Sequence, residues 1–344
     1  MNGRTFLLVV SALLGSLMSS CRRDSKEAAA PCAAVTTPYQ LDHPSYFPKP
    51  LIPNDNPLTR EGVALGRMLY YDTLLSRNGP FEGFACASCH DQARSFTVPT
   101  SGTNVLPHVN LAWSTHFLWN GKVSGTLEDV MRFEVNDFFQ VDINVLKEHR
   151  DYPKRFRQAF GTCDLTSDQV VKALAQWFRR MSSTNNKFDR YLTGQTNLTT
   201  AELQGAMLFL SEVGDCFHCH ATPLMTDNAF HNIGLETSFT GFDVGRYAIT
   251  GAPMDMGAFK TPTLRNIALT APYMHDGRFQ TLEEVVEFYN SGVQHSASLD
   301  PLMTKPGTGL QLGLSPEQRS DLVAFLHTLS DDTFLTDPEL ASPF

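Results

Sequence analysis

Two five-residue segments, 130 positions apart, constrain what this chain can fold into. They are Cys86-Ala87-Ser88-Cys89-His90 and Cys216-Phe217-His218-Cys219-His220. Two thiols on one helical turn can add to the two vinyl groups of a porphyrin, while the adjacent imidazole binds its iron. Zinc knuckles and redox dithiols also use Cys-x-x-Cys, but neither explains the histidine that follows each pair. The sequence therefore predicts two covalently bound haems c, with His90 and His220 as iron ligands.

Length and charge narrow the class of protein further. A chain of 344 residues is long enough for two domains, and 42% hydrophobic with 18% charged residues is an ordinary globular composition. The net charge of −9 argues against nucleic acid as a partner, because phosphate binding needs a basic surface.

The N-terminus reads as an export signal. Arg4 precedes an apolar run from Phe6 to Met18, which is too short to span a bilayer. Leu17-Met18-Ser19-Ser20 leads into Cys21 as a bacterial lipoprotein signal does, so we expect a periplasmic protein held at a membrane through lipid on Cys21. Ordinary signal cleavage nearby is the alternative.

Two further cysteines remain, Cys32 and Cys163. In an oxidising compartment they are either joined in a disulfide or remain as two unrelated free thiols, and the sequence does not decide between these alternatives.

Helix signals dominate the rest of the chain. Tyr39 to Pro57 carries five prolines and is expected to be extended, and a short helix is expected from Thr59 to Tyr71. Five capping boxes then open apolar runs, at Thr126/Asp129, Thr166/Gln169, Thr199/Glu202, Thr281/Glu284 and Ser315/Gln318. Strand alternation never lasts more than a few residues. The prediction is an all-α protein with a domain boundary at Ser182 to Asn186.

A repeat accompanies the two haem motifs. The segment from Pro107 through Trp119-Asn120-Gly121 to Phe133-Glu134 matches the segment from Pro262 through His275-Asp276-Gly277 to Phe288-Tyr289 with small gaps. Equivalent positions in two related haem domains should lie over equivalent faces of the two haems.

These residues resemble the bacterial di-haem cytochrome c peroxidases, and more closely their MauG-like branch. The most specific pieces are Gly257 to Asn266, Ala271 to Gly277 and Leu282 to Tyr289. The resemblance implies two cytochrome c-like, all-α haem domains packed across an interface. We expect a signal peptide at 1–20, a tether and extended segment at 21–57, a peroxidatic haem domain at 58–184 and an electron-transfer haem domain at 185–335.

The resemblance also implies roles for single residues. Tyr289 would be the second axial ligand of the C-terminal haem, where peroxidases of the family carry Met and MauG-like members Tyr. Trp119 would lie between the haems and carry electrons. Arg265 would pair with a haem propionate, and calcium would bind Asn104, Thr270 and Pro272, all of which are oxygen donors.

Two positions depart from the family pattern. The family's distal Gln and Glu on the peroxidatic haem should fall near Val130 and Phe139, and neither residue can transfer a proton. The repeat offers a replacement, because Glu134 follows Thr126 by eight residues as Tyr289 follows Thr281. Glu134 is thus expected over haem 1 with a pKa raised by burial, as the distal acid.

The resulting expectation is an oxidoreductase that reduces hydrogen peroxide at haem 1 with electrons relayed through haem 2. The electrons would come from a small cytochrome or cupredoxin, or from side chains of a partner protein. The alternative is a di-haem electron carrier without peroxide turnover, in which His108, His116 or another ligand closes haem 1.

Overall fold

The computed structural model describes residues 32–344 except 101, 306 and 308, and Ala33–Phe344 form one compact unit. The expected signal segment, Cys21 and the tether Arg22–Ala30 lie outside the described residues. The fold is predominantly helical, as expected. Within the described part of the chain, no helix has the length and apolarity needed to cross a membrane. Cys32 and Cys163 are both disulfide-bonded.

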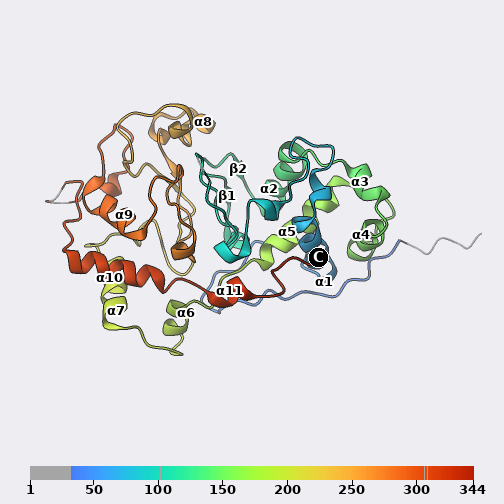
Figure 1. Ribbon diagram of the computed structural model, residues 1–344, viewed down its shortest axis with the longest axis horizontal. Coiled ribbons are helices and arrows are strands. Elements are labelled where there is room, and N and C mark those ends of the chain that lie inside the picture. The colour runs from blue at the N-terminus through green and yellow to red at the C-terminus, as the bar shows by residue number, and fades with distance from the viewer. Residues whose placement is uncertain (1–31, 101, 306, 308) are drawn as a thin grey trace, which may run out of the picture. The chain divides into compact units, whose positions relative to one another are not determined.

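Short helices and two small sheets make up the compact unit. Each sheet is one antiparallel pair, with His116 opposite Ser124 in the first and Phe230 opposite Lys260 in the second. In Figure 1, α1 to α5 gather in one half and α6 to α10 in the other. The elements are α1 Arg60–Tyr71, β1 His116–Phe117, β2 Val123–Ser124, α2 Leu127–Phe133, α3 Ile143–Glu148, α4 Tyr152–Phe160, α5 Ser167–Arg180, α6 Lys187–Leu192, α7 Thr200–Phe209, β3 Phe230–His231, α8 Tyr247–Thr250, β4 Phe259–Lys260, α9 Leu282–Glu287, α10 Pro316–His327 and α11 Asp332–Thr336.

All five expected capping boxes are confirmed at helix starts. In each, the side chain three residues into the box accepts a hydrogen bond from the backbone N–H of the cap residue, which satisfies an amide that the helix leaves free. The helix expected from Thr59 is α1, where the Thr59 hydroxyl accepts from the Gly62 N–H at 3.0 Å. These starts were predictable because a cap is local in sequence.

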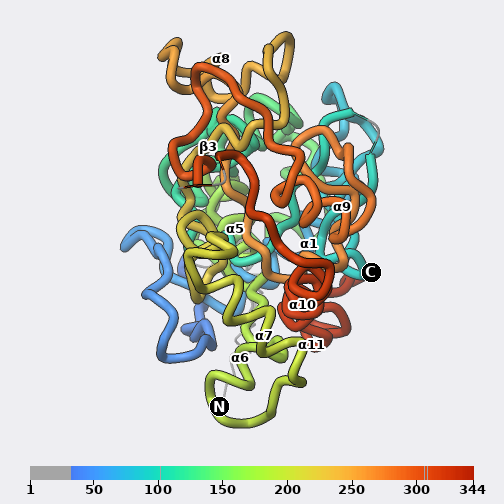
Figure 2. Tube along the Cα trace, turned by 90° about the vertical axis from the view of Figure 1, so that its left-hand side faces the viewer, coloured from blue at the N-terminus to red at the C-terminus, as the bar shows by residue number. Residues whose placement is uncertain are grey.

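Each half has its own hydrophobic core built on one helix crossing. In the first half α1 packs on α5, and in the second α7 packs on α10, where the two lie side by side in both views (Figures 1 and 2). A glycine makes each crossing close: a Cβ on Gly66 would collide with the Ala173 carbonyl, and one on Gly205 with the Asp321 carbonyl. Both helix crossings are therefore close because one helix has a glycine where it meets the other.

The segment expected as a domain boundary is a buried polar linker between these cores. Ser183 and Asn186 are fully buried. The Ser183 N–H donates to Asn110 Oδ1 at 2.7 Å, and the Ser183 carbonyl accepts from Asn110 Nδ2 at 3.0 Å. Hydrogen bonds take the place of apolar packing here, so the linker is fixed to the first half.

The repeat seen in the sequence is also a structural repeat. Asn110 and Asn266 both adopt left-handed backbone conformations, with φ of 56° and 63°. The Asn110 N–H donates to the carbonyl of Met181 after α5, and the Asn266 N–H donates to that of Leu329 after α10. Both α2 and α9 continue into a π-helical turn, at Glu134–Phe138 and Phe288–Gly292.

The two copies of the repeat meet in a reciprocal pair of backbone hydrogen bonds. The Asn104 N–H donates to the His275 carbonyl at 2.7 Å, and the Lys260 N–H donates to the Trp119 carbonyl at 2.8 Å. Asn104 and Lys260 are 156 residues apart, as are Trp119 and His275, so each bond is the repeat image of the other. The halves therefore contact one another through equivalent segments, as in a two-fold interface.

The C-terminal segment returns to the first half, which the sequence did not predict. The Phe334 ring on α11 lies 5.4 Å from the Phe96 ring, edge to face, and Tyr71 donates to the Leu340 carbonyl at 2.6 Å. Phe334 and Leu340 are buried in the first core.

The glycine crossing of the second half can be tested by Gly205→Ala. The added methyl has no space against the Asp321 carbonyl, so we expect a loss of about 1–3 kcal/mol in the free energy of unfolding, measured by chemical denaturation of the haem-loaded protein. Met207→Ala on the same helix is the control, because that side chain is 60% exposed and its loss should cost less than about 0.5 kcal/mol. Equal stabilities of G205A and M207A would contradict the close crossing.

Candidate haem sites

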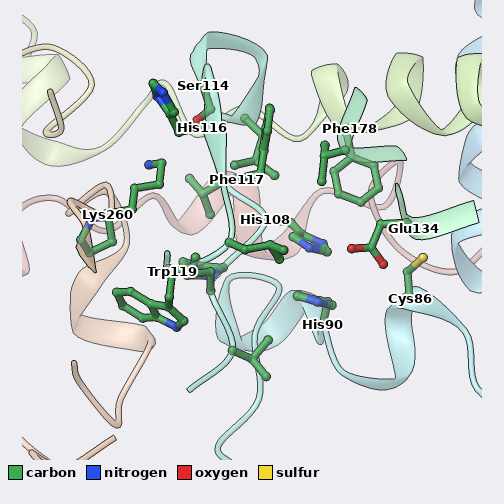
Figure 3. A pocket seen from close by; sticks show the side chains of 18 of the residues that line it. Cys86, His90, His108, Ser114, His116, Phe117, Trp119, Glu134, Phe178 and Lys260 are labelled. Atoms are coloured by element: carbon green, nitrogen blue, oxygen red, sulfur yellow. The ribbon is translucent and has the colours of Figure 1, made fainter. Parts of the chain in front are cut away.

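The first Cys-x-x-Cys-His motif opens onto a cavity of about 730 Å³, here called cavity 1. Its lining is mainly apolar, and Figure 3 shows Cys86 at one end with Trp119 and Lys260 at the other. His90 lies between these ends. From one end of the cavity to the other, its lining therefore includes a thiol, an imidazole and an ammonium group.

Both motif histidines are held by a hydrogen bond from the ring nitrogen Nδ1 to a backbone carbonyl. His90 Nδ1 bonds the Phe96 carbonyl at 2.8 Å, and His220 Nδ1 bonds the Met225 carbonyl at 3.1 Å. Phe96 and Met225 are both buried and both have positive φ, 59° and 54°, which turns their carbonyls toward the rings. With Nδ1 as the donor, Nε2 is left as the acceptor, which is the tautomer that binds iron.

The second motif opens onto a narrower cavity of about 190 Å³, here called cavity 2. Cys216, Cys219, His220 and Tyr289 all line it, together with aliphatic side chains from α9 and α10. Burial raises the pKa of the Tyr289 phenol above its usual range, with the sulfur groups of Cys219 and Cys216 adding to the shift. The expected thiols, proximal histidine and tyrosine are thus gathered in one cavity.

Trp119 and Lys260 line both cavities, so the two sites share a wall. The Trp119 indole donates from Nε1 to the Asn104 carbonyl at 2.7 Å. Its ring lies edge to face with His275, with the ring centres 6.5 Å apart. The structure therefore brings the expected tryptophan to the junction of the two cavities in a fixed orientation.

Glu134 is the single carboxylate among the described residues that line cavity 1. Its side chain points toward the His90–His108 pair in Figure 3, near Cys86. Burial raises the pKa of Glu134 to about 7, although the Lys122 ammonium partly opposes the shift. The expected direction of the shift is confirmed. Val130 and Phe139, at the family's distal positions, line the same cavity as apolar side chains.

His108 is placed against the face of His90. The two rings are stacked, 3.4 Å apart at 15°, and Tyr70 Oη lies 3.2 Å from His108 Nδ1. An imidazole binds iron along its ring plane, so a group stacked on the face of His90 does not lie opposite it across an iron. His116 lies on β1 with its ring against Phe230.

Two of the three residues expected at calcium, Asn104 and Pro272, are in contact. Asn104 is buried, and its side-chain Nδ2 contacts the Pro272 carbonyl at 2.6 Å and the Met274 carbonyl at 3.0 Å. Thr270 is buried in the same loop. Which atom of the Asn104 amide faces the carbonyls follows from the hydrogen-bond network, and a cation there would favour the oxygen. The donor set fits a hard cation.

Arg265 is buried and fully hydrogen-bonded within the protein. Its guanidinium forms a two-pronged ion pair with Asp189, both contacts at 2.8 Å, and also donates to the carbonyls of Pro223 and Ser183. Every nitrogen of the side chain therefore has a protein acceptor in the structure. Through these bonds Arg265 joins the linker to the second half, and its expected pairing with a haem propionate stays a prediction.

Comparison with known proteins identifies the family to which this chain belongs. Residues 60–197 match the family model for di-haem cytochrome c peroxidases. The methylamine utilization protein MauG of Methylorubrum extorquens is 34% identical, over 96% of this chain and 93% of that protein. The chain belongs to the di-haem cytochrome c peroxidase family, on its MauG-like branch.

Further relatives of this di-haem peroxidase agree with that assignment. The cytochrome-c peroxidase IdrP1 of a Pseudomonas species is 31% identical, over 84% of this chain and 86% of that protein. A crystal structure described as a MauG-like protein associated with microbial copper homeostasis superposes with a TM-score of 0.81 at 31% identity, and covers 89% of this chain and 99% of that one. The family implies two haems c and an oxidoreductase acting on peroxide.

One charged group beside the second haem site was missed from the sequence. His231 lies between Asp227 and Asp300, at 2.9 and 2.6 Å, and the hydrogen bonds with Asp227 and Cys219 raise its pKa to about 11. The spacing of Asp227 and His231 gave a weak signal, but Asp300 is 69 residues away from His231 and had none.

Proposed function

We propose that this di-haem peroxidase reduces hydrogen peroxide at the haem of cavity 1, with electrons relayed through the haem of cavity 2. In this proposal residues 58–184 and 185–335 are the two haem domains, and the chain is exported and anchored through lipid on Cys21. The electron source is a small cytochrome or cupredoxin, or the side chains of a partner protein. The observation that supports the proposal best is a single carboxyl, with a pKa near 7, facing cavity 1.

Glu134 supplies the acid-base step that cleavage of the O–O bond requires. Its carboxylate accepts the first proton of hydrogen peroxide and returns it to the leaving oxygen, which departs as water. The haem iron supplies the two-electron redox chemistry when the haem is bound. A pKa of about 7 suits this role, because the same group must both take and give a proton near neutral pH. Val130 and Phe139, which line the same cavity, are apolar and cannot carry out this proton transfer themselves.

Trp119 carries the electrons between the two sites. Its indole ring lines both cavities, and its hydrogen bond to Asn104 fixes the ring where the two cavities share a wall. Tyr289 lines cavity 2 with Cys216, Cys219 and His220 and would hold the iron of a bound haem through its phenolate oxygen. A phenolate ligand favours ferric and higher-valent iron, which suits oxidation of a partner protein as in the MauG-like branch.

The role of Glu134 is tested by Glu134→Gln. Both haems should remain attached, while the second-order rate of reaction with peroxide falls by about 10²–10⁴. In the wild type the rate should rise with pH through about 7, because the carboxyl must be deprotonated to accept a proton, and this rise should be absent from the variant. Stopped-flow mixing of the ferric protein with peroxide measures both.

Asp137→Asn is the matched control for that experiment. It removes a carboxylate from the same π-helical turn, but Asp137 is exposed and does not line cavity 1. Wild-type rates are expected. A wild-type rate and pH profile in E134Q would remove Glu134 from the mechanism.

The role of Tyr289 is tested by Tyr289→Phe. The ring volume remains while the oxygen ligand is lost, so the low-spin signal of the second haem should change and its midpoint potential should rise. Tyr273→Phe is the control, because Tyr273 lines the same cavity but donates its hydroxyl proton to the Ile267 carbonyl. Identical electron paramagnetic resonance spectra for Y289F and wild type would show that Tyr289 only packs.

We also propose that Asn104, Thr270 and Pro272 hold one calcium ion through their oxygens. Its removal should loosen Trp119, whose indole is bonded to the Asn104 carbonyl. Elemental analysis should find one calcium per wild-type chain, little in Asn104→Leu, and one in the control Asn120→Leu. Chelation of the wild-type protein should slow electron transfer between the haems. The proposal would be contradicted if the wild-type protein, freed of calcium, transferred electrons between the haems at an unchanged rate.

A further inference from the structure

A buried lysine at the wall between the two cavities has no use in the mechanism above. Lys260 is 7% exposed and lines both cavity 1 and cavity 2. Its ammonium donates one hydrogen bond among the described residues, to the Thr261 carbonyl at 3.1 Å. An ammonium carries three N–H donors, so two are left to face the cavities.

The groups around Lys260 do not neutralise it. The carboxylate of Asp227 favours the charged form of Lys260, but it is bonded to His231 at 2.9 Å. His116 nearby is disfavoured as a cation by burial and by Arg246 and Lys260. Burial lowers the pKa of Lys260 to about 8. A buried ammonium with free donors is costly unless an anion is supplied from outside the chain.

The shape of cavity 1 identifies that anion. The vinyl groups of a porphyrin, which the cysteines bind, and its two propionates lie on opposite edges of the ring. Figure 3 shows Cys86 at one end of the cavity and Lys260 with Trp119 at the other. A haem attached at the thiol end therefore directs its carboxylates toward Lys260. Arg265, by contrast, has all its nitrogens engaged with protein acceptors.

We propose that the Lys260 ammonium binds a haem propionate at the junction of the two cavities and so fixes that carboxylate beside Trp119. This inference rests on the proposed binding of both haems, but it does not require peroxide turnover. In the bound pair the ammonium offsets the negative charge of the propionate, which otherwise favours the ferric state, so the pair favours the reduced state of the haem it contacts.

The test compares Lys260→Met, Lys260→Arg and Lys122→Met in the haem-loaded protein. Lys122 also lines cavity 1, but it is exposed and lies 4.6 Å above the Phe133 ring, so K122M removes a lysine from the same cavity without touching the junction. Spectroelectrochemical titration gives the haem midpoint potentials, and resonance Raman scattering gives the propionate bending modes.

K260M should keep both thioether-bound haems, lower the midpoint potential of at least one haem and shift a propionate mode. K260R should restore both readouts, because it keeps the charge, and K122M should match the wild type. Wild-type potentials and propionate modes in K260M would overturn the proposal. If K260R then showed shifted potentials or modes, the Lys260 side chain would matter for packing alone.

If K260M cannot be recovered with haem, K260R decides alone: wild-type potentials support the charge role and shifted potentials overturn it. Since no readout uses peroxide, failure here and failure of the peroxidase proposal are distinguishable.

Discussion

Trp119 is held from both halves of the chain, and the arrangement of the two cavities depends on how it is held. Its carbonyl accepts from the Lys260 N–H of the second half, while its indole donates to Asn104 of the first. Asn104 in turn donates to the His275 carbonyl of the second half. Three hydrogen bonds thus link the four residues Lys260, Trp119, Asn104 and His275 across the interface, and a rotation of one half would break several bonds at once. The wall shared by the cavities is fixed for this reason.

The same scaffold is used twice, and the differences lie in the side chains that face the cavities. Both copies have a left-handed asparagine, a capping box, a π-helical turn and a glycine at the helix crossing. On the π-helical turn, however, the first copy offers the carboxyl of Glu134 and the second the phenol of Tyr289. His108, which stacks on His90, has Leu264 as its counterpart in the second copy, because the N–H of each donates to the carbonyl that holds the motif histidine. In the proposed function the carboxyl exchanges protons with peroxide and the phenolate binds iron, so the proposed difference between the two sites depends on one side chain in each copy.

Local signals in the sequence predicted local features well. The haem motifs and the five capping boxes each depend on residues at most four positions apart, and the repeat that predicted Glu134 needed only a comparison of two segments of the sequence. Tertiary features were beyond such signals. Gly66 and Gly205 look like ordinary helix-weakening glycines until the partner helix is seen. Phe334 and Leu340 give no hint in sequence that they fill the first core.

The clearest case of what sequence alone does not give is the pair of cations in the segment Gly257 to Asn266. Family resemblance favoured Arg265 as the propionate partner, since a guanidinium is the usual choice for binding a carboxylate. The structure shows that Arg265 already has such a carboxylate in Asp189, together with two carbonyls, whereas Lys260 has one carbonyl. What separates the two residues is the number of donors left free after folding. That number is set by the fold around each side chain and cannot be read from residue type.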